Sequence, residues 1–465
     1  IALRRDAAEY GLLVAEPACC GGAIPGRAAN SVEIFLALPI DPTPRMLTLS
    51  GQWTRLIGDP SGWRHRLRDA RPIEDDAVAG VAGVAGVAGV AGVAGVASAA
   101  VHGRRLFLGA GAALGLVACS AGRYAPYAES AAALNDAKAL LAESVTIDVH
   151  SHAGRVILAR DPLTGPTRPF TPLARPMRDG GMNAICLAIV ADTTATRVAS
   201  DGKSFEPFRA PAAGEMYAHA QAAFARARAL IENQGLHVID DAAALRAARS
   251  GGPAVVIASE GADFLEGRLD RVDEAHRLHG LRHLQLTHYR VNELGDIQTE
   301  PPVHGGLTDF GADVVRRCNA LGIVVDVAHG THALVRRAAA VTTKPLVLSH
   351  TSLAARPGPR SRQISPAHAR LVADTGGVIG VWPSAGIYAS LDAMAAGARR
   401  LADVVGADHV ALGSDMLGFI TTPVFNSYRQ LPAYAGALLS AGFTRAEVGK
   451  VLGGNYLRVF EATLG

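Results

Sequence analysis

Short apolar runs alternate with longer helical segments from Val145 to the end of the chain, and this alternation is the strongest constraint on the fold. The runs have the character of buried strands and are eight in number: Val145–Val149, Asn183–Val190, Ala254–Ala258, Leu281–Leu286, Ile323–Val327, Leu346–Leu348, Val378–Val381 and His409–Leu412. The segments between them are amphipathic or rich in alanine, as in Ala212–Asn233, Asp309–Leu321, Pro366–Asp374, Leu391–Val405 and Ser427–Ala441. Apolar strands that alternate with helices are typical of a parallel sheet buried on both faces.

The number of strand–helix units favours a closed barrel. Eight units fit one α/β domain over residues 145–465 with the (β/α)8 architecture of a TIM-type barrel. The competing architecture is an open, doubly wound sheet. No Gly-x-Gly-x-x-Gly motif follows the first strand, as it does in the dinucleotide-binding form of that sheet. We therefore predict the barrel.

Most of the chain before the barrel has the character of low-complexity sequence. We interpret residues 1–102 as an N-terminal extension that is either not native to the folded protein or disordered. Its most regular part repeats Val-Ala-Gly six times between Val78 and Gly95. A glycine at every third position costs a helix about 1 kcal/mol each, and the run lacks the proline of a collagen-like triple helix. Residues 120–144 are predicted to form a tether that leads into a helix.

Residues 103–119 resemble a bacterial export signal. Arg104 and Arg105 form a twin-arginine pair, and a short apolar stretch leads to Leu-Val-Ala-Cys, which is similar to a lipobox ending at Cys119. The resemblance implies a mature protein that begins at Cys119 and carries lipid on that sulfur. Such a protein would lie on the periplasmic side of a bacterial membrane. The alternative interpretation is a surface loop followed by a buried helical turn.

Composition excludes two other classes of protein. Lys and Arg number 45 and Asp and Glu 42, so the formal charge of +3 is too small for a protein that binds nucleic acid electrostatically. Five cysteines in 465 residues make no disulfide framework. Since 49% of the residues are hydrophobic, the chain can bury a large core.

Six of the eight apolar runs end in residues that can bind a metal or transfer a proton. In chain order, these residues are Asp148, His150 and His152, then Glu260, His288, His329, His350 and Asp415. In a (β/α)8 barrel the carboxyl ends of the strands meet at one mouth, where the active sites of this architecture lie. His276 and His279, one helical turn apart elsewhere, are instead predicted to lie on a solvated helix face.

These residue types suit a site with two cations. His150 and His152 are two residues apart on a strand, so their side chains share a face and can bind one cation. His329 and His350 end consecutive strands and can bind a second. Glu260 can bridge the two, because one carboxylate offers an oxygen to each. Two cations that share a water bring its pKa toward neutrality, and Asp415 can take the proton and return it to a leaving group.

The chain from about Thr146 to Glu461 resembles the membrane (renal-type) dipeptidases, zinc peptidases of the metal-dependent amidohydrolase superfamily. The resemblance lies in motifs that occur in order and at barrel intervals: Ile-Asp-Val-His-Ser-His (147–152), Ser-Glu-Gly-Ala (259–262), Leu-Thr-His-Tyr (286–289), His-Gly-Gly-Leu-Thr-Asp-Phe-Gly (304–311), Val-Asp-Val-Ala-His (325–329), Leu-Ser-His-Thr-Ser (348–352), Leu-Gly-Ser-Asp (412–415) and Gly-Gly-Asn-Tyr-Leu-Arg-Val-Phe-Glu (453–461). Together these motifs are highly specific.

The resemblance implies a role for each of the strand-end residues. His150 and His152 would bind the first zinc and His329 and His350 the second, with Glu260 as the bridge. His288 would bind the substrate carbonyl and stabilise the oxyanion. Asp415 would activate the bridging water and receive the free amine of a dipeptide. The family commonly has Asp at the position of His152, a change that keeps a ligand and removes a negative charge.

A planar guanidinium suits the terminal carboxylate of a dipeptide. The resemblance assigns this role to Arg362, and Arg360 is the alternative. The implied enzyme is therefore a dipeptidase in which a hydroxide that bridges two Zn²⁺ ions attacks the peptide bond. It would have no nucleic-acid partner, would be lipid-anchored, and could form a homodimer. The competing interpretations are a hydrolase of lactones, lactams or N-acyl amino acids, and an inactive metal-binding lipoprotein.

Overall fold

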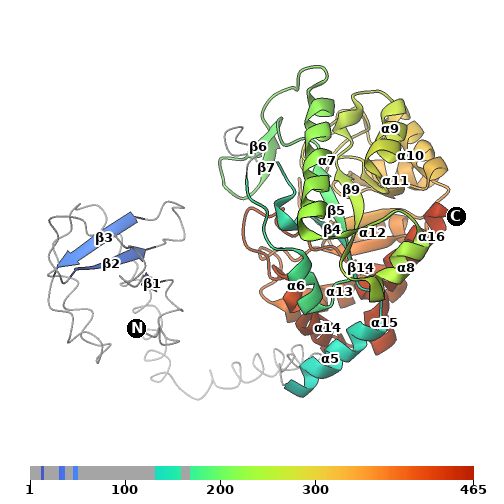
Figure 1. Ribbon diagram of the computed structural model, residues 1–465. Helices are drawn as coiled ribbons and strands as arrows, with labels where there is room; N and C mark the ends of the chain where they lie inside the picture. Colours follow the sequence, from blue (N-terminus) through green and yellow to red (C-terminus); the bar gives the residue numbers. More distant parts are fainter. Residues whose placement is uncertain (1–11, 15–30, 37–44, 51–130, 159–167) are drawn as a thin grey trace, which may run out of the picture. The chain divides into compact units, whose positions relative to one another are not determined.

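The computed structural model describes residues 12–14, 31–36, 45–50, 131–158 and 168–465 (Figure 1). The chain divides into two compact units, Ile1–Val117 and Ala118–Gly465. The signal-like segment 103–119, with Cys119, lies outside the described residues. The prediction of an export signal and lipid attachment therefore stays a prediction.

The first unit contains three strands in an antiparallel sheet of order β1-β2-β3. Their bounds are β1 (Leu12–Val14), β2 (Ser31–Leu36) and β3 (Arg45–Ser50). Period-two alternation in β2, where Val32, Glu33 and Ile34 follow one another, suits a short strand. The strands lie inside the segment interpreted as a low-complexity extension. The Val-Ala-Gly repeat of that segment lies outside the described residues.

The second unit is a closed barrel of eight parallel strands, as predicted. Neighbouring strands pair in the order β10-β11-β12-β13-β14-β4-β5-β9, and β10 also pairs with β9, which closes the ring. The strands are β4 (Ile147–Ser151), β5 (Ala184–Val190), β9 (Ala254–Glu260), β10 (His283–Gln285), β11 (Val324–Asp326), β12 (Val347–Thr351), β13 (Val378–Val381) and β14 (Val410–Leu412). Each one lies within or overlaps one of the eight predicted apolar runs.

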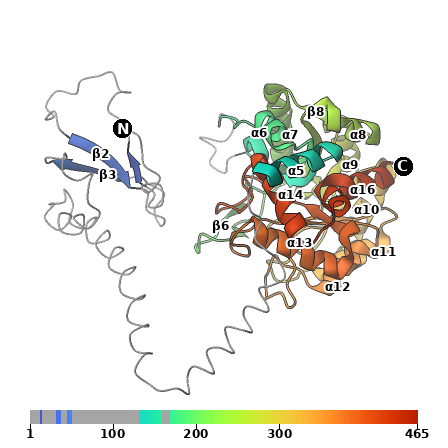
Figure 2. The same ribbon diagram turned by 90° about the horizontal axis from the view of Figure 1, so that it is seen from below.

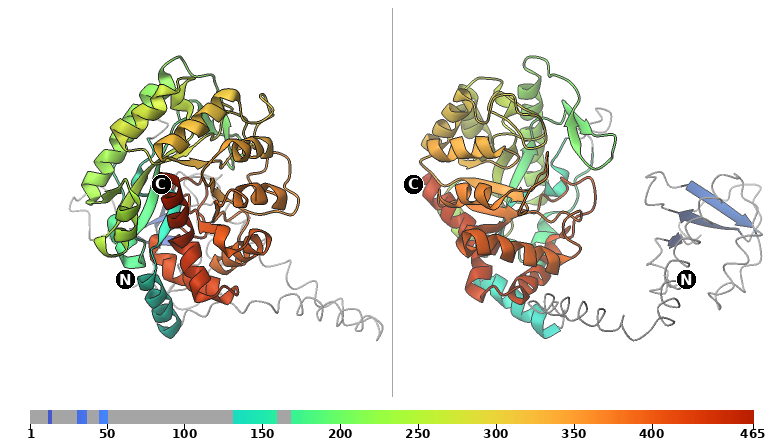
Figure 3. Two further views of the ribbon diagram at one scale, coloured as in Figure 1. Left: turned by 90° about the vertical axis from the view of Figure 1, so that its right-hand side faces the viewer. Right: turned by 180° about the vertical axis from the view of Figure 1, so that it is seen from behind.

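Helices surround the strand ring (Figures 1 and 3). They are α5 (Ala131–Glu143), α6 (Ala174–Gly180), α7 (Glu215–Gln234), α8 (Ala242–Gly251), α9 (Asp270–His279), α10 (Asp309–Leu321), α11 (His332–Val341), α12 (Pro366–Ala373), α13 (Leu391–Val405), α14 (Leu431–Ser440), α15 (Arg445–Gly449) and α16 (Asn455–Leu464). The bounds of α10 and α13 are those predicted, because Thr308 and Ser390 cap their first turns. Helix α5 lies against α14 (Figure 2). Among the described residues, no helix combines the length and apolarity needed to cross a membrane.

The strands are buried on both faces, which explains why they read as continuous apolar runs. In β5, the side chains of Ile185 and Leu187 belong to a hydrophobic cluster that they share with the helices packed around the barrel. Ala184 and Cys186 belong to a second cluster, with side chains from strands all around the barrel. Small residues at these inward positions suit the confined interior of an eight-stranded barrel.

Two short β elements were not predicted. Strand β8 (His237–Ile239) pairs in parallel with β9 outside the ring and is too short for a period to be recognised. Strands β6 (Thr196–Val198) and β7 (Phe205–Pro207) form an antiparallel hairpin between β5 and α7. The hairpin projects from the barrel in Figures 1 and 3. It therefore lies beside the mouth of the barrel rather than in its wall.

One sequence interpretation was wrong. His279 does not lie on a solvated helix face but is buried, with its ring stacked on Phe224 at a centroid distance of 4.4 Å. Its ring nitrogens lie 2.7 Å from Arg228 Nη1 and 2.9 Å from Gln221 Oε1. These partners belong to α7, so packing of α9 on α7 buries the histidine. His276 is half-buried.

His368, near the start of α12, is expected to make the barrel less stable in mild acid. Burial, with the charges of His332 and Arg362, lowers its pKa from 6.5 to about 4. Between these values the unfolded chain binds a proton that the folded chain does not, so stability falls as pH falls from 6.5 to about 4. The loss amounts to about 3 kcal/mol. Urea unfolding at pH 7.5 and 4.5 should show that His368→Leu has a smaller loss than the wild type; an equal loss would contradict this role.

Candidate metal centre

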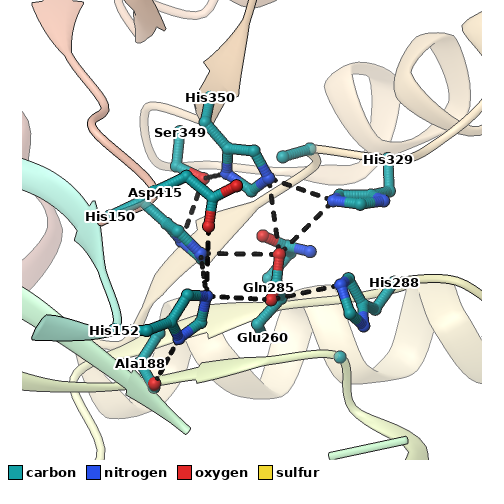
Figure 4. Close-up of polar contacts among 12 residues, drawn as sticks. His150, His152, Ala188, Glu260, Gln285, His288, His329, Ser349, His350 and Asp415 are labelled. Carbon is teal, nitrogen blue, oxygen red and sulfur yellow. Dashed lines mark hydrogen bonds and ion pairs between the residues drawn. The ribbon is translucent and has the colours of Figure 1, made fainter. Parts of the chain in front are cut away.

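The five predicted metal ligands meet at the carboxyl ends of the strands (Figure 4). All five are buried, with 1 or 2% of each residue exposed: His150, His152, Glu260, His329 and His350. Each side chain lies at or just beyond the end of β4, β9, β11 or β12. The barrel therefore brings together residues that are up to two hundred positions apart in the sequence.

Glu260 lies at the centre of the cluster. Its Oε1 lies 3.3 Å from Nε2 of His329 and 3.4 Å from Nε2 of both His150 and His350. Its Oε2 lies 3.1 Å from Nε2 of His152 and 3.2 Å from Nε2 of His288. One carboxylate thus presents an oxygen to each of two groups of imidazoles. This is the position that a bridging ligand requires.

The spacing of the donor atoms fits metal binding. In a tetrahedral site with Zn–N distances near 2.0–2.1 Å, ligand atoms lie about 3.3 Å apart. The Nε2 atoms of His150 and His152 are 3.2 Å apart, and those of His329 and His350 are 3.0 Å apart. Three groups of side chains among the described residues meet the geometric requirement for a cation: His150 with His152 and Asp415, His150 with Glu260 and His350, and Glu260 with His288 and His329.

These three groups differ from the predicted ligand sets, which pair His150 with His152 and His329 with His350. Asp415 Oδ1 lies 3.3 Å from His152 Nε2, so Asp415 can serve as a ligand as well as a proton acceptor. His288 shares a group with Glu260 and His329, in addition to its predicted role toward substrate. The identity of each ligand set stays a prediction. The geometry adds Asp415 and His288 to the residues that can hold a metal.

Hydrogen bonds on the far side of the rings aim Nε2 into the cluster. His152 Nδ1 lies 2.8 Å from the Ala188 carbonyl and must donate to it, which leaves the Nε2 lone pair for a metal. His350 Nδ1 lies 2.9 Å from Ser349 Oγ. An ionised aspartate in place of His152 would have no hydrogen-bond donor for the Ala188 carbonyl. The Ala188 carbonyl therefore favours a histidine over an aspartate at position 152.

The protonation of the cluster favours cation binding, with one exception. Burial raises the pKa of Glu260, but the nearby His288 and His150 hold it well below its usual range, so the carboxylate is charged. Burial lowers the pKa of His329 and His350, so both are neutral at pH 7. Burial also lowers the pKa of His152, but hydrogen bonds to Asp415 and Glu260 raise it to about 10. A proton and a cation therefore compete for the position at His152.

Strained backbone holds two of the cluster residues. His329 and Asp415 have φ values of 65° and 46°, in the left-handed region that non-glycine residues rarely adopt. Gly418 allows Asp415 this position, because a Cβ at Gly418 would lie 1.9 Å from Asp415 Oδ1. Trp382 Nε1 donates to Asp415 Oδ2 at 3.1 Å. Strain of this kind clusters at functional sites, where it fixes the orientation of side chains.

A pocket of about 630 Å³ opens onto the cluster. Arg362 lines it together with Glu260, His288 and Asp415. Its Nη1 donates to Gln298 Oε1 at 2.8 Å, and its buried Nε has no partner among the described residues. Arg360, the alternative anchor, is exposed and does not line the pocket. The structure therefore favours Arg362 as the cation that meets a ligand in this pocket.

Asp192 was not predicted as a site residue. It is fully buried, its Oδ1 lies 2.7 Å from His288 Nδ1, and its Oδ2 accepts from the Tyr289 amide at 3.0 Å. Asp192 follows β5 by two residues, so the rule that found the other strand-end residues applies to it as well. It fixes the orientation of His288.

Two buried carboxylates inside the strands were also missed as positioning residues. Asp326 Oδ1 accepts from the amides of Ala328 and Ser349 at 2.9 and 3.0 Å. Asp148 Oδ1 accepts from the Ser414 amide at 2.9 Å. Each of these amides belongs to the residue just before His329, His350 or Asp415. The two aspartates thus tie together neighbouring strand ends that carry the site.

The fold is similar to those of several solved structures. An amidohydrolase from Pseudomonas aeruginosa matches with a TM-score of 0.55 and 22% identity, over 71% of this chain and 99% of that chain. A metallopeptidase from Rhodobacter sphaeroides, bound to a phosphinate mimic of the dipeptide L-Ala-D-Ala, matches with a TM-score of 0.58 and 22% identity, over 68% and 99%. At this identity the likeness shows the fold.

Several sequence relatives are dipeptidases of fungi. Dipeptidase verJ of Clonostachys rogersoniana is 28% identical over 222 residues, which are 46% of this chain and 56% of the relative. Dipeptidase aclJ of Aspergillus oryzae is 33% identical over 192 residues, 39% of this chain and 44% of the relative. The chain spans about half the length of these relatives.

The model of the membrane dipeptidase family, peptidase family M19, matches residues 134–464, which comprise the whole barrel. The chain therefore belongs to the membrane dipeptidase family.

Proposed function

We propose that this protein is a dipeptidase that holds two Zn²⁺ ions in the cluster around Glu260. The observation that carries the proposal is the convergence of five imidazole Nε2 atoms on the two oxygens of one buried carboxylate. His150 and His152 would hold one ion, and His329 and His350 the other. The membership of the dipeptidase family supports the proposed reaction, and the donor set supports zinc as the proposed metal.

Bound zinc would acidify water and polarise the scissile carbonyl. Asp415 would accept the proton of that water and pass it to the leaving amine, since Trp382 holds one of its oxygens and the other faces the cluster. His288 would donate from Nε2 to the developing oxyanion. Burial lowers the pKa of His288, but the carboxylates of Asp192 and Glu260 raise it above its usual value. That direction favours the doubly protonated ring, which has an Nε2 proton to donate.

Two charged anchors would set the length of the substrate. Arg362 would bind the terminal carboxylate, and Asp415 would receive the free amine. Both line the same pocket, at the ends of β12 and β14. A peptide longer than two residues would have to bury a neutral amide against one of these charges, which is unfavourable.

Asp192→Asn is expected to reduce turnover roughly 10- to 100-fold, because the neutral amide orients His288 less firmly and no longer stabilises its charge. The bound metal should be unchanged, since Asp192 contacts none of the five proposed ligands. The lower pKa of His288 should move the alkaline fall in activity to lower pH. A pH–rate profile of this variant, with the exposed Asp313→Asn as a matched control, measures both effects. An unshifted profile would contradict the role.

The test of the proposed function is a panel of dipeptides, N-acetylated dipeptides and lactones, combined with elemental analysis of the purified protein. We expect about two zinc ions per chain and hydrolysis of free dipeptides alone. Turnover that is unchanged when the amine is blocked would instead favour a lactone, lactam or N-acyl amino acid hydrolase on the same scaffold. Metal without turnover of any compound would favour a metal-binding lipoprotein.

We also propose that the protein is exported and anchored through lipid on Cys119. The support is the order of basic, apolar and small-residue segments in 103–119. Labelling with a radioactive fatty acid in a bacterial host tests it, with Cys119→Ala as the control. Label that persists in the variant would contradict the anchor. A homodimer stays a proposal that sedimentation of the purified protein can test.

A further inference from the structure

We propose that the pocket has an anion subsite, formed by Arg155, Arg168 and Lys203, which selects dipeptides with an acidic N-terminal residue. The inference rests on the proposed function and names a substrate class for it. All three cations line the pocket of the metal centre. The acidic residues that line it are Glu260 and Asp415, which belong to the cluster itself.

The three cations have no acidic partner at ion-pair distance among the described residues, in contrast to Arg197 and Arg209 nearby, which pair with Glu206 and Glu215. A pocket wall with several cations that lack ion-pair partners attracts an anion. The free charges therefore point to an anionic group of the ligand.

One buried guanidinium positions two of the cations. Arg226 of α7 donates from Nε and Nη2 to the Arg155 carbonyl at 3.1 and 2.8 Å, and from Nη2 to the Arg168 carbonyl at 2.8 Å. Arg226 is 8% exposed and lies over the Phe170 ring at 4.5 Å. It ties the segment after β4 to the segment before α6. Both of these segments present an arginine to the pocket.

The backbone at Arg155 is held in a conformation that the sequence does not favour. Arg155 has a φ of 62°, directly after Gly154 with a φ of 76°. A Cβ at Gly154 would lie 2.8 Å from the side chain of Leu230, so close packing fixes this turn. A long side chain rarely adopts the left-handed region unless its surroundings impose it. The turn places Arg155 three residues after His152, at the mouth of the barrel.

The third cation comes from another element. Lys203 lies in the turn of the β6–β7 hairpin, which projects beside the mouth (Figures 1 and 3). The Asp201 carboxylate accepts from the Lys203 amide at 2.8 Å, and this bond orders the turn. Asp201 also attracts the ammonium group electrostatically but forms no ion pair with it. Three separate segments thus contribute a positive charge to one wall.

The order of strands places this wall nearer the N-terminal residue of a dipeptide. The amine anchor, Asp415, follows β14, which pairs with β4, and Arg155 follows β4. The carboxylate anchor, Arg362, follows β12, three strands from β4 in the ring. A side chain next to the free amine therefore extends toward Arg155 and Lys203. An aspartate or glutamate at that position supplies the carboxylate that the wall lacks.

The experiment compares kcat/KM for Glu-Ala and Gln-Ala, which differ by one charge and have nearly the same shape, using the zinc-loaded full chain at pH 7.5. We expect Glu-Ala to be preferred roughly tenfold at low ionic strength, and less in 0.5 M NaCl, because salt screens the charges. Arg155→Gln, Arg168→Gln and Lys203→Gln should each reduce the preference roughly twofold, and the triple variant should nearly abolish it. Arg175→Gln, which removes a surface arginine outside the pocket, should retain it.

The outcomes separate this inference from the function on which it rests. Hydrolysis of both dipeptides at equal rates overturns the subsite and leaves the dipeptidase proposal intact. A preference for Ala-Glu over Glu-Ala overturns the placement of the acid at the N-terminal residue. Hydrolysis of no dipeptide at all overturns the proposed function and the subsite with it.

Discussion

Glu260→Gln is expected to lose most of the bound metal and, with it, essentially all activity. The carboxylate lies within 3.4 Å of five imidazole nitrogens and is the one negative charge that both proposed ion positions share. A neutral amide donates no charge and has a single oxygen, so it cannot bridge two cations. Elemental analysis should find less than half of the wild-type zinc, and turnover should fall at least a thousandfold.

The control for this experiment is Glu461→Gln, which removes a half-exposed carboxylate that pairs with Arg246 at 2.6 Å. This variant should retain full zinc and activity, since exposed ion pairs contribute little to stability. Circular dichroism should show that both variants are folded. A Glu260→Gln protein with wild-type zinc content would contradict the bridging role.

Asp415→Asn is expected to lower turnover by about three to four orders of magnitude, the range associated with loss of a general acid–base group and of charge near a metal. Asparagine fills the same space and can still accept the hydrogen bond from Trp382 Nε1. It cannot take a proton from water or neutralise a free amine. KM should therefore rise as kcat falls, and stopped-time assays at several dipeptide concentrations separate the two effects.

Zinc content after Asp415→Asn distinguishes the two roles that the geometry allows this residue. Retention of both ions assigns Asp415 to proton transfer, and loss of one assigns it to the group with His150 and His152. Asp403→Asn, a surface residue that pairs with Arg399, is the matched control. Unchanged turnover in Asp415→Asn would contradict both roles and favour a protein that binds metal without catalysis.

The barrel could be predicted because its signal is local. Strands buried on both faces appear as unbroken apolar runs, and six of the eight end at residues that can bind a metal or transfer a proton. Both the number of strands and the position of the mouth therefore follow from the chain alone. Helices α10 and α13 could be placed to the residue because Thr308 and Ser390 are good N-terminal caps. The same strand-end rule gave the residues that meet around Glu260.

What could not be predicted depends on distances between segments. Which donor atoms can share one cation depends on how far each imidazole ring extends into the barrel. The spacing of these residues along the chain does not determine this. Asp148 and Asp326 act through amides on other strands, so their positioning role is visible only after the strands are paired. His279 looked solvated because the residues that bury it belong to α7, some fifty positions away.

Closure of the strand ring has a consequence for how the protein matures. The donors extend from His150 to His350, and all five meet around Glu260 in the closed barrel, in which β14 pairs with β4 and β10 with β9. We therefore expect the proposed zinc ions to bind with their complete ligand sets only after the barrel has closed. A chelator should remove these ions and leave a folded, metal-free barrel that can bind zinc again.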